Sequence, residues 1–301
     1  TVVKDTKQKE DGTWDVFKTF TLASALDENL IKIDTEFSNL EKTIKCGNNL
    51  IREYDDKLPN NLTAEEILIR SGNIGSVRIA QKVGIEKFRS FLSKLNLLKQ
   101  LDFDVEEVGK PISFKWGKCR LATTSFGHGI TITPLQLAKG YAIISNGGFE
   151  IKPTIIKDNE EKLFQYKKRI INKNVSIEIN NILRKIVSTK NGTAGLANVK
   201  GYEIGGKTGT AEKIVFGKYS SRKKINTFAS IFPISKPKFV LVVVLDEPNI
   251  NNNYIYNYRD GSNFKLKGTP RNTSGWTTVE ATGHIIEKIG PILATKYLEF
   301  N

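Results

Sequence analysis

The chain has 301 residues, of which 39% are hydrophobic and 26% are charged, so it can bury the core of one large domain or two modest ones and is not a disordered chain. The formal net charge is +14 at pH 7, but the basic residues are spread along the sequence and their densest group is only Arg222-Lys223-Lys224. We therefore expect no nucleic-acid partner, because polyanion binding favours a concentrated basic patch.

Cysteine and histidine are too few and too scattered to indicate a metal site. The two cysteines, Cys46 and Cys119, and the two histidines, His128 and His284, lie far apart without ligand-like spacing. We expect no metal and no cofactor, and the sequence leaves open whether the cysteines form a disulfide. His128 stands between two glycines and is expected to be structural, whereas His284 is expected on the surface of a helix.

Helical patterns dominate the chain up to about residue 190. Residues 1–14 show no apolar periodicity and are expected to be a loose arm. Apolar residues at helical spacing then predict a series of helices, two of which begin at the capping sequences Thr63 to Glu66 and Thr133-Pro134. Besides the short helix that opens at Thr63, the predicted helices cover residues 16–26, 74–83, 85–98, 134–146 and 177–187.

The last third of the chain changes to strand-like patterns. Three runs predict an antiparallel meander whose final turn is bracketed by Pro233 and Pro237. These predicted strands cover residues 203–215, 227–232 and 239–245, and the last of them, the longest apolar run, is far too short to span a membrane. A closing helix is predicted over 278–298, interrupted near Gly290-Pro291. This order of elements predicts an α+β domain, with an antiparallel sheet flanked by helices.

One motif points toward nucleotide binding but lacks the right context. Residues 201–208 satisfy the phosphate-loop pattern, with two glycines before Lys207-Thr208. A phosphate loop needs a buried strand before it and a helix after it, and residues 192–200 supply no strand. Gly209 follows at once and the next residues favour a strand. Nucleotide binding is therefore the least favoured alternative.

Two tripeptides predict acyl-transfer chemistry instead. Ser71-Gly72-Asn73 stands ahead of an apolar helix, and Lys207-Thr208-Gly209 stands on a predicted strand. Each is weak alone, but their order is specific. The other matching segments are Ser125 to Gly129, Ile132 to Ala138, Gly206 to Lys213 and Thr273 to Trp276. Together they closely resemble the transpeptidase domain of class B penicillin-binding proteins, the septal type most of all, over residues 16 to 295.

This resemblance implies a penicillin-binding and β-lactamase-like fold and a D,D-transpeptidase that cross-links D-alanyl-D-alanine stem peptides and is acylated by β-lactams. It implies that Lys18 takes the proton of a serine nucleophile, that Ser71 relays protons and that Asn73 holds the substrate backbone. The residues implied to bind the substrate carboxylate and the oxyanion are Lys207, Thr208, Gly209 and Thr210. Simpler alternatives remain: Ser71 and Asn73 capping a helix, and Lys207 as an ordinary charge at a strand edge.

The sequence departs from the family at the nucleophile. Lys18 and the Thr19 to Ala23 run after it match, but Asp15 stands where the family has serine, three residues before the lysine. An aspartate has no hydroxyl proton to yield, and we expect it to form an ion pair with Lys18 one turn on. As a structural residue it is expected to cap the helix. We therefore predict that the chain is catalytically impaired.

A second departure is length, because only fourteen residues precede Asp15, and in the family two sheet strands lie upstream of the nucleophile. We expect an N-terminally truncated chain with a non-matching arm, 1–14, and a transpeptidase domain, 15–301. The resemblance implies the periplasmic face of the bacterial inner membrane, with any anchor upstream, and divisome membrane proteins as partners. The alternatives are a non-catalytic module that keeps the peptide groove, and a β-lactamase or carboxypeptidase of the same fold.

Overall fold

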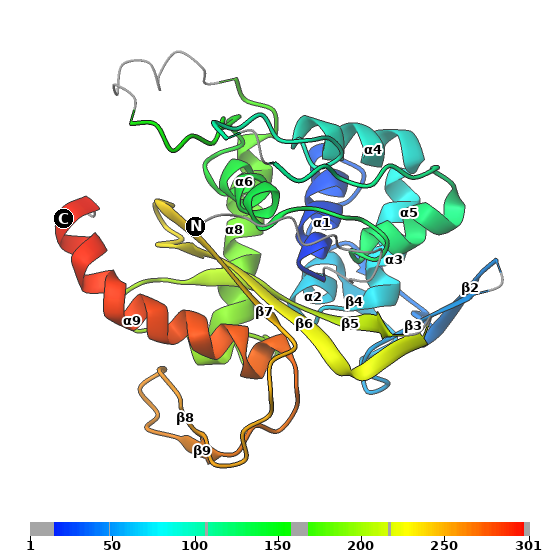
Figure 1. Ribbon diagram of the computed structural model, residues 1–301. Coiled ribbons are helices and arrows are strands. Elements are labelled where there is room, and N and C mark those ends of the chain that lie inside the picture. The colour runs from blue at the N-terminus through cyan, green and yellow to red at the C-terminus, as the bar shows by residue number, and fades with distance from the viewer. Residues whose placement is uncertain (1–14, 48, 106–107, 158–167, 216–217, 298–301) are drawn as a thin grey trace.

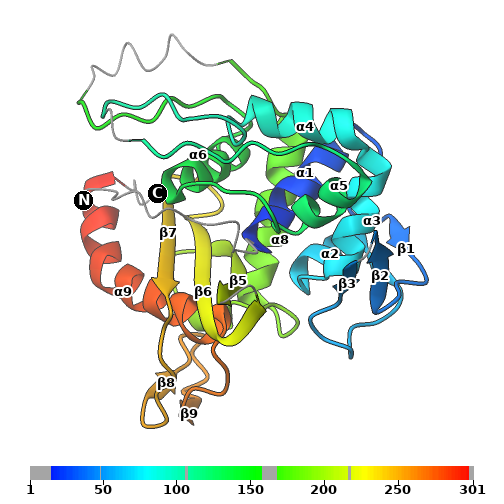
Figure 2. The ribbon, with the colours of Figure 1, turned by 45° about the vertical axis from the view of Figure 1, so that its right-hand side comes forward.

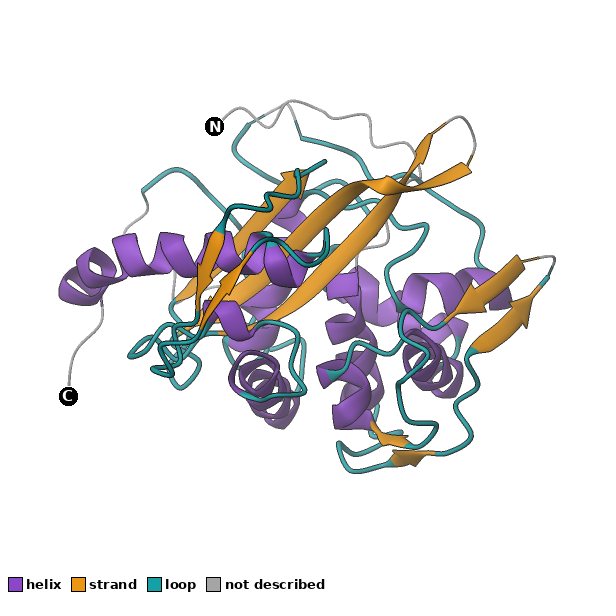
Figure 3. Cartoon of the chain, turned by 90° about the horizontal axis from the view of Figure 1, so that it is seen from below, coloured by secondary structure: helices purple, strands orange, loops and turns teal. Residues whose placement is uncertain are grey.

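The computed structural model describes residues 15–47, 49–105, 108–157, 168–215 and 218–297. A central antiparallel sheet is covered by α9 (Thr278–Tyr297) on one face and by α8 (Lys173–Ser188) on the other (Figures 1 and 2). The remaining helices form a helical part beside the sheet (Figure 3). The predicted α+β fold class is therefore confirmed, while the arm 1–14 lies outside the described residues.

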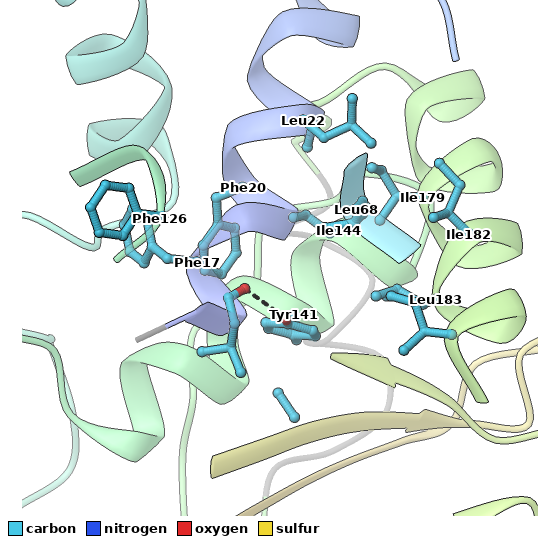
Figure 4. Close-up of a cluster of buried hydrophobic side chains, with 14 of the residues drawn as sticks. Phe17, Phe20, Leu22, Leu68, Phe126, Tyr141, Ile144, Ile179, Ile182 and Leu183 are labelled. Atoms are coloured by element: carbon cyan, nitrogen blue, oxygen red, sulfur yellow. Dashed lines mark hydrogen bonds between the residues drawn. The ribbon is translucent and has the colours of Figure 1, made fainter. Parts of the chain in front are cut away.

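The first described helix runs through the centre of the molecule. A 3-10 turn, Asp15–Phe17, leads into α1 (Lys18–Asp27), whose residues from Lys18 to Leu26 are all buried. The rings of Phe20 and Tyr141 lie 5.5 Å apart, and the Tyr141 hydroxyl donates to the Val16 carbonyl at 2.8 Å (Figure 4). A helix buried all round suits this sequence, because its apolar residues face every direction.

Most helices begin where the sequence places them. Thr63 and Thr133 both form the predicted capping boxes. The predicted helix 85–98 is too long, since the chain ends α4 at Lys94 and Asn96 adopts a left-handed φ of 64°. The helix predicted at 177–187 starts earlier, because the Asn172 side chain caps it. The helices of this part are α2 (Ala64–Ile69), α3 (Asn73–Val83), α4 (Ile85–Lys94), α5 (Lys118–Ser125) and α6 (Pro134–Ser145).

The predicted meander is the central sheet. Its strands are β5 (Gly205–Val215), β6 (Lys218–Phe232) and β7 (Phe239–Asp246), in the antiparallel order β5-β6-β7. In the described residues, β7 has a strand neighbour on one side only. The register pairs Lys207 with Ala229 and Gly209 with Thr227. The Lys207–Thr210 segment therefore lies on an edge strand of the described sheet, facing the helical part (Figure 1).

Three small antiparallel pairs were not predicted. They are β1 (Glu36–Phe37) with β4 (Leu62–Thr63), β2 (Thr43–Cys46) with β3 (Asn49–Arg52), and β8 (Ile255–Asn257) with β9 (Lys265–Lys267). Strands this short carry too few residues to display an alternating pattern. Cys46, at the end of β2, is bonded to Cys119 in α5, with their Cα atoms 5.5 Å apart. The question that the sequence left open is answered by a disulfide.

The predicted interruption of the last helix is wrong. α9 continues through Pro291 as one helix to Tyr297. A proline inside a helix removes one backbone hydrogen bond, but packing along the length of this helix outweighs the loss. Gly290 lies against Tyr202, where a Cβ atom would come within 2.5 Å of the ring, and the Tyr297 ring lies 6.0 Å from that of Phe239. The predicted end at Leu298 lies outside the described residues.

Candidate active site

Three polar side chains from distant parts of the sequence meet where the helical part adjoins the sheet. Lys18 comes from the first turn of α1, Ser71 from the turn between α2 and α3, and Lys207 from β5. The Ser71 hydroxyl oxygen accepts from Lys207 Nζ at 2.7 Å and from Lys18 Nζ at 3.2 Å. All three residues are buried. The structure thus brings together three of the side chains that the sequence singled out.

The backbone at Ser71 is unusual and well held. Its φ of 60° lies in the left-handed region, which non-glycine residues rarely adopt and which often marks a functional site. The Ser71 N–H donates to the Leu68 carbonyl at 3.2 Å, and the Gly72 N–H donates to the Ile67 carbonyl at 2.9 Å. This turn points the hydroxyl at the two ammonium groups instead of at the end of a helix. Ser71 therefore does not act merely as a helix cap.

Asp15 lies beside the cluster and engages Lys18. Its Oδ1 atom lies 2.9 Å from Lys18 Nζ, which confirms the predicted ion pair. Lys18 Nζ also donates to the Ser71 carbonyl at 2.8 Å. A lysine ammonium has three N–H donors, and the Asp15 carboxylate, the Ser71 carbonyl and the Ser71 hydroxyl can take all of them. The expectation that Asp15 caps the helix is wrong, because the N-cap of α1 is Phe17 and no side chain caps it.

Lys207 is a strongly perturbed cation. Its pKa is lowered from the ordinary 10.5 to about 7, mainly by burial and then by the nearby charge of Lys18, while Asp15 opposes both effects. Desolvation acts in this direction because it disfavours the charged form of an amine. Its Nζ atom also donates to the Thr208 carbonyl at 3.0 Å. Near neutral pH, Lys207 is therefore poised between its charged and neutral forms, and a bound anion would favour the charged one.

Strand β5 lies against the start of the first helical turn at Gly209. A Cβ atom there would lie 3.2 Å from the Val16 nitrogen and 3.3 Å from the Asp15 nitrogen, so a side chain would push the two backbones apart by a few tenths of an ångström. The flanking hydroxyls have their own partners. Thr208 Oγ1 is hydrogen-bonded to Thr193 Oγ1 at 2.7 Å, and Thr210 Oγ1 accepts from the Ser274 N–H at 2.9 Å. Backbone and hydroxyl groups from β5 and from residue 15 therefore line one site.

Asn73, two residues after Ser71, faces the β2–β3 hairpin. Its Nδ2 atom donates to the Arg52 carbonyl at 3.0 Å. Its Oδ1 atom is buried and has no hydrogen-bond partner among the described residues. Buried polar atoms are nearly always paired, so an unpaired acceptor beside this cluster calls for an explanation.

Several residues at the site escaped the sequence analysis. Thr193 belongs to a glycine-rich connection, and its only signal was the sequence Gly192-Thr193-Ala194. Glu53 accepts from the Asn73 N–H and Tyr54 donates to the Arg70 carbonyl just before Ser71, and nothing in their local sequence indicates it. Ser274 was noted as part of a matching segment, without a role.

The two histidines lie apart from this cluster. His128 stacks on Phe126 with ring centroids 6.2 Å apart, and burial followed by the charge of Arg120 lowers its pKa. His284 is 51% exposed on α9, as expected, and is hydrogen-bonded to the Tyr254 hydroxyl at 2.8 Å. In the described part of the chain, no group of three or more His, Cys, Asp or Glu residues could hold a metal ion.

A buried Lys-Ser-Lys cluster between an all-helical part and an antiparallel sheet defines the class of penicillin-binding and β-lactamase-like folds. Solved structures share the fold. The transpeptidase domain of penicillin-binding protein 3 from Burkholderia pseudomallei superimposes with a TM-score of 0.80 and 24% identity, over 97% of this chain and 81% of that one. Penicillin-binding protein 3 from Mycobacterium tuberculosis gives 0.74 and 21%, over 94% and 63%.

Sequence comparison identifies the family. The model of the penicillin binding protein transpeptidase domain matches residues 16–262, and the chain belongs to that family. A probable peptidoglycan D,D-transpeptidase FtsI from Caulobacter vibrioides is 32% identical over 93% of this chain and 46% of its own length. A peptidoglycan D,D-transpeptidase FtsI homolog from Mesostigma viride is 32% identical over 78% and 44%. The chain thus spans about half the length of these curated relatives.

Proposed function

We propose that residues 15–301 form a peptidoglycan D,D-transpeptidase domain that binds the D-alanyl-D-alanine end of stem peptides, and β-lactams, but is impaired in acyl transfer. The observation that carries this proposal is the ion pair between Asp15 and Lys18 beside an otherwise complete Lys18–Ser71–Lys207 cluster. The relatives' names supply the substrate class, because they describe peptidoglycan D,D-transpeptidases.

The proposed impairment follows from the chemistry of the first step. A serine-type transpeptidase attacks the peptide carbonyl with a hydroxyl oxygen, and a neutral lysine takes the proton. Asp15 offers no hydroxyl proton, and acylation of a carboxylate would give a labile anhydride. The same carboxylate is ion-paired with Lys18, the residue that would have to take the proton, and so occupies it. Losing the nucleophile of such a unit costs on the order of a millionfold in turnover in serine enzymes.

Binding is proposed to survive because it uses other groups. The Lys207 ammonium and the Thr208 and Thr210 hydroxyls supply a cation and donors for the terminal carboxylate. The backbone N–H groups of residues 15 and 210 are proposed to receive the carbonyl oxygen of the ligand, since Gly209 brings β5 against the start of the helical turn. The unpaired Oδ1 atom of Asn73 is proposed to accept a peptide N–H of the ligand.

The wider setting is also a proposal. From the resemblance to septal transpeptidases, we propose that the protein acts in septal cell-wall synthesis on the periplasmic face of the inner membrane, with divisome membrane proteins as partners. None of the described helices is long and apolar enough to cross a bilayer.

The alternative, a non-catalytic module that only recognises stem peptides or partner proteins, is favoured by the closed Asp15–Lys18 ion pair. The two proposals differ in whether the remaining site can perform chemistry once a serine is restored.

Labelling with a fluorescent penicillin tests both. We expect no covalent adduct on the unmodified chain by gel fluorescence and intact mass, and a stoichiometric adduct on Asp15→Ser. Asp15→Asn is the matched control, because it removes the charge without adding a hydroxyl, and it is expected to stay unlabelled. Stoichiometric labelling of the unmodified chain would overturn the proposed impairment. An unlabelled, folded Asp15→Ser would favour the non-catalytic module.

A further inference from the structure

Three consecutive residues that begin at the end of β3, Arg52 to Tyr54, hold the turn that carries Ser71. We call them the 52–54 clamp. The Glu53 carboxylate accepts from the Asn73 N–H at 2.8 Å through Oε1 and from the Ile74 N–H at 3.1 Å through Oε2. These are the first two N–H groups of α3, and the N-cap residue Gly72 has no side chain to receive them. Glu53 therefore caps α3 from twenty residues upstream.

The flanking residues of the clamp hold both ends of the same turn. The Arg52 carbonyl accepts from Asn73 Nδ2 at 3.0 Å, and the Tyr54 hydroxyl donates to the Arg70 carbonyl at 2.6 Å, just before Ser71. The clamp is anchored in turn, since the Glu53 N–H donates to the Lys42 carbonyl at 2.8 Å. Partial burial, and then the carboxylates of Asp55, Glu53 and Asp15, raise the pKa of Tyr54 to about 12, so its hydroxyl remains a donor at all physiological pH.

The turn needs such support because its conformation is costly and its task is geometrically demanding. Ser71 keeps a left-handed backbone, which persists only where the surroundings enforce it. Its hydroxyl must lie within hydrogen-bonding distance of two lysines at once, at 2.7 and 3.2 Å. A small rotation of the turn would lengthen both contacts. It would also move Asn73 Oδ1, whose place depends on the amide being held by Arg52.

We propose that Glu53 is a positioning residue for the Ser71 hydroxyl and the Asn73 amide, acting through the backbone of the turn. This inference rests on the proposed function, because Ser71 and Asn73 matter there as the proton relay and the peptide-binding amide. Among the described residues, Glu53 itself makes no hydrogen bond or ion pair with Lys18, Lys207 or Asp15.

The test uses Asp15→Ser as the parent and compares Glu53→Gln, Glu53→Asp and Glu86→Gln. Glutamine keeps the shape of Glu53 but turns one acceptor into a donor that faces a helix N–H, whereas aspartate keeps both oxygens. Glu86→Gln is the matched control, since Glu86 is an exposed acidic residue in the first turn of α4. The readouts are the second-order rate constant of penicillin acylation over pH 6 to 9 and the thermal midpoint of unfolding.

We expect Glu53→Gln to slow acylation by about 10- to 100-fold when the rate is measured at a temperature well below the thermal midpoint of this variant. Displacing a reacting group by about 1 Å has effects of this size. Glu53→Asp should recover part of the rate, and Glu86→Gln should leave it unchanged. A folded Glu53→Gln that acylates at the parent's rate, with only a lower thermal midpoint, would overturn the proposal.

A second readout separates this inference from the proposed function. If Asp15→Ser is not acylated, the proposed function fails, and amide hydrogen exchange of the unmodified chain decides the inference about Glu53. Exchange at Asn73 and Ile74 should then speed up at least about tenfold in Glu53→Gln and stay unchanged in Glu86→Gln. Equal exchange in the unmodified chain and in Glu53→Gln would overturn the positioning role.

Discussion

Asp15 Oδ1 lies 2.9 Å from Lys18 Nζ, one helical turn away, in a pair whose lysine is 1% exposed and whose aspartate is 23% exposed. The pair leaves one carboxylate beside two buried ammonium groups, because Lys207 shares the Ser71 hydroxyl with Lys18. A carboxylate in this position therefore has two opposite consequences. Under the proposed function it stands where a serine nucleophile would be needed, and it provides a negative charge beside a cluster whose other charged side chains are cationic.

The first prediction is that removing this charge destabilises the fold. Asp15→Asn should lower the free energy of unfolding by about 1 to 3 kcal/mol, between the values typical of exposed and buried ion pairs. Urea denaturation measures the change. Asp102→Asn is the control, because Asp102 pairs with Lys152 at the surface, and it should change stability by less than about 0.5 kcal/mol. Equal effects of the two variants would contradict a stabilising role of Asp15.

The second prediction concerns the pH dependence of ligand binding. Lys207 has a pKa of about 7, so it is charged below pH 7 and loses its proton as the pH rises above it. An N-acetylated D-alanyl-D-alanine dipeptide keeps an ionised carboxylate over this range. Its affinity should therefore be constant below about pH 6 and fall by up to about tenfold per pH unit above 7, with proton uptake on binding in titration calorimetry.

Two variants check that Lys207 causes this pH dependence of dipeptide binding. Lys207→Met should bind the dipeptide weakly and without this pH dependence, whereas Lys213→Gln, on the same strand but ion-paired with Asp246 and Glu247, should keep it. The effect of rising pH on stability is opposite to its effect on dipeptide binding. Burial lowers the folded-state pKa of Lys207, so its contribution to stability rises with pH between 7 and 10.5 and is constant below 7. A pH-independent affinity in the unmodified chain would refute the assignment.

The third prediction tests the close approach of β5 to residue 15. Gly209→Ala places a methyl group 3.2 to 3.3 Å from two backbone nitrogens, so strand and turn must separate. We expect a loss of about 1 to 3 kcal/mol in stability and weaker dipeptide binding. Gly195→Ala is the control, since nothing lies within 4 Å of the added Cβ atom, and it should leave both quantities nearly unchanged. If Gly209→Ala binds the dipeptide as tightly as the unmodified chain does, the close approach of β5 to residue 15 is not part of the binding site.

Local sequence was sufficient for those parts of the site that are local in sequence. The spacing of Asp15 and Lys18 places both on one helical face, and the ion pair follows from that spacing. The Lys207–Thr210 strand and the Ser71–Asn73 turn were recognised as motifs, and the capping boxes at Thr63 and Thr133 located two helices. In each of these cases the determining contacts lie within a few residues along the chain.

The remaining features depend on contacts that no local pattern records. Glu53 caps a helix that begins twenty residues later, and only the folded hairpin brings it there. α5 has the sequence Lys-Cys-Arg-Leu-Ala-Thr-Thr-Ser, whose single Leu and Ala give no apolar stripe, so its helix depends on packing. α9 passes through Pro291 for the same reason. Tertiary packing outweighed local preference in both helices.

The fourth prediction concerns the Cys46–Cys119 disulfide, which ties the β2–β3 hairpin to α5 across 73 residues. Closing a loop of this length restricts the unfolded chain, so its loss should lower the free energy of unfolding by about 2 to 5 kcal/mol. We expect this change for the Cys46→Ser/Cys119→Ser double variant and for the unmodified chain in reductant, measured by urea denaturation. Reductant should have no effect on the double variant, which serves as the control for unspecific effects of the thiol.

The hairpin ends at Arg52, the first residue of the 52–54 clamp, so the disulfide should matter locally as well as globally. Hydrogen exchange in reductant is expected to increase more in residues 49–52 than in the β5–β6 pair, because the disulfide tethers the hairpin and does not involve these two strands. In the Asp15→Ser background, the reduced protein should acylate more slowly, and Glu53→Gln should add little to that loss, because both changes loosen the same turn. Additive losses, or an unchanged rate in reductant, would show that the clamp holds without the disulfide.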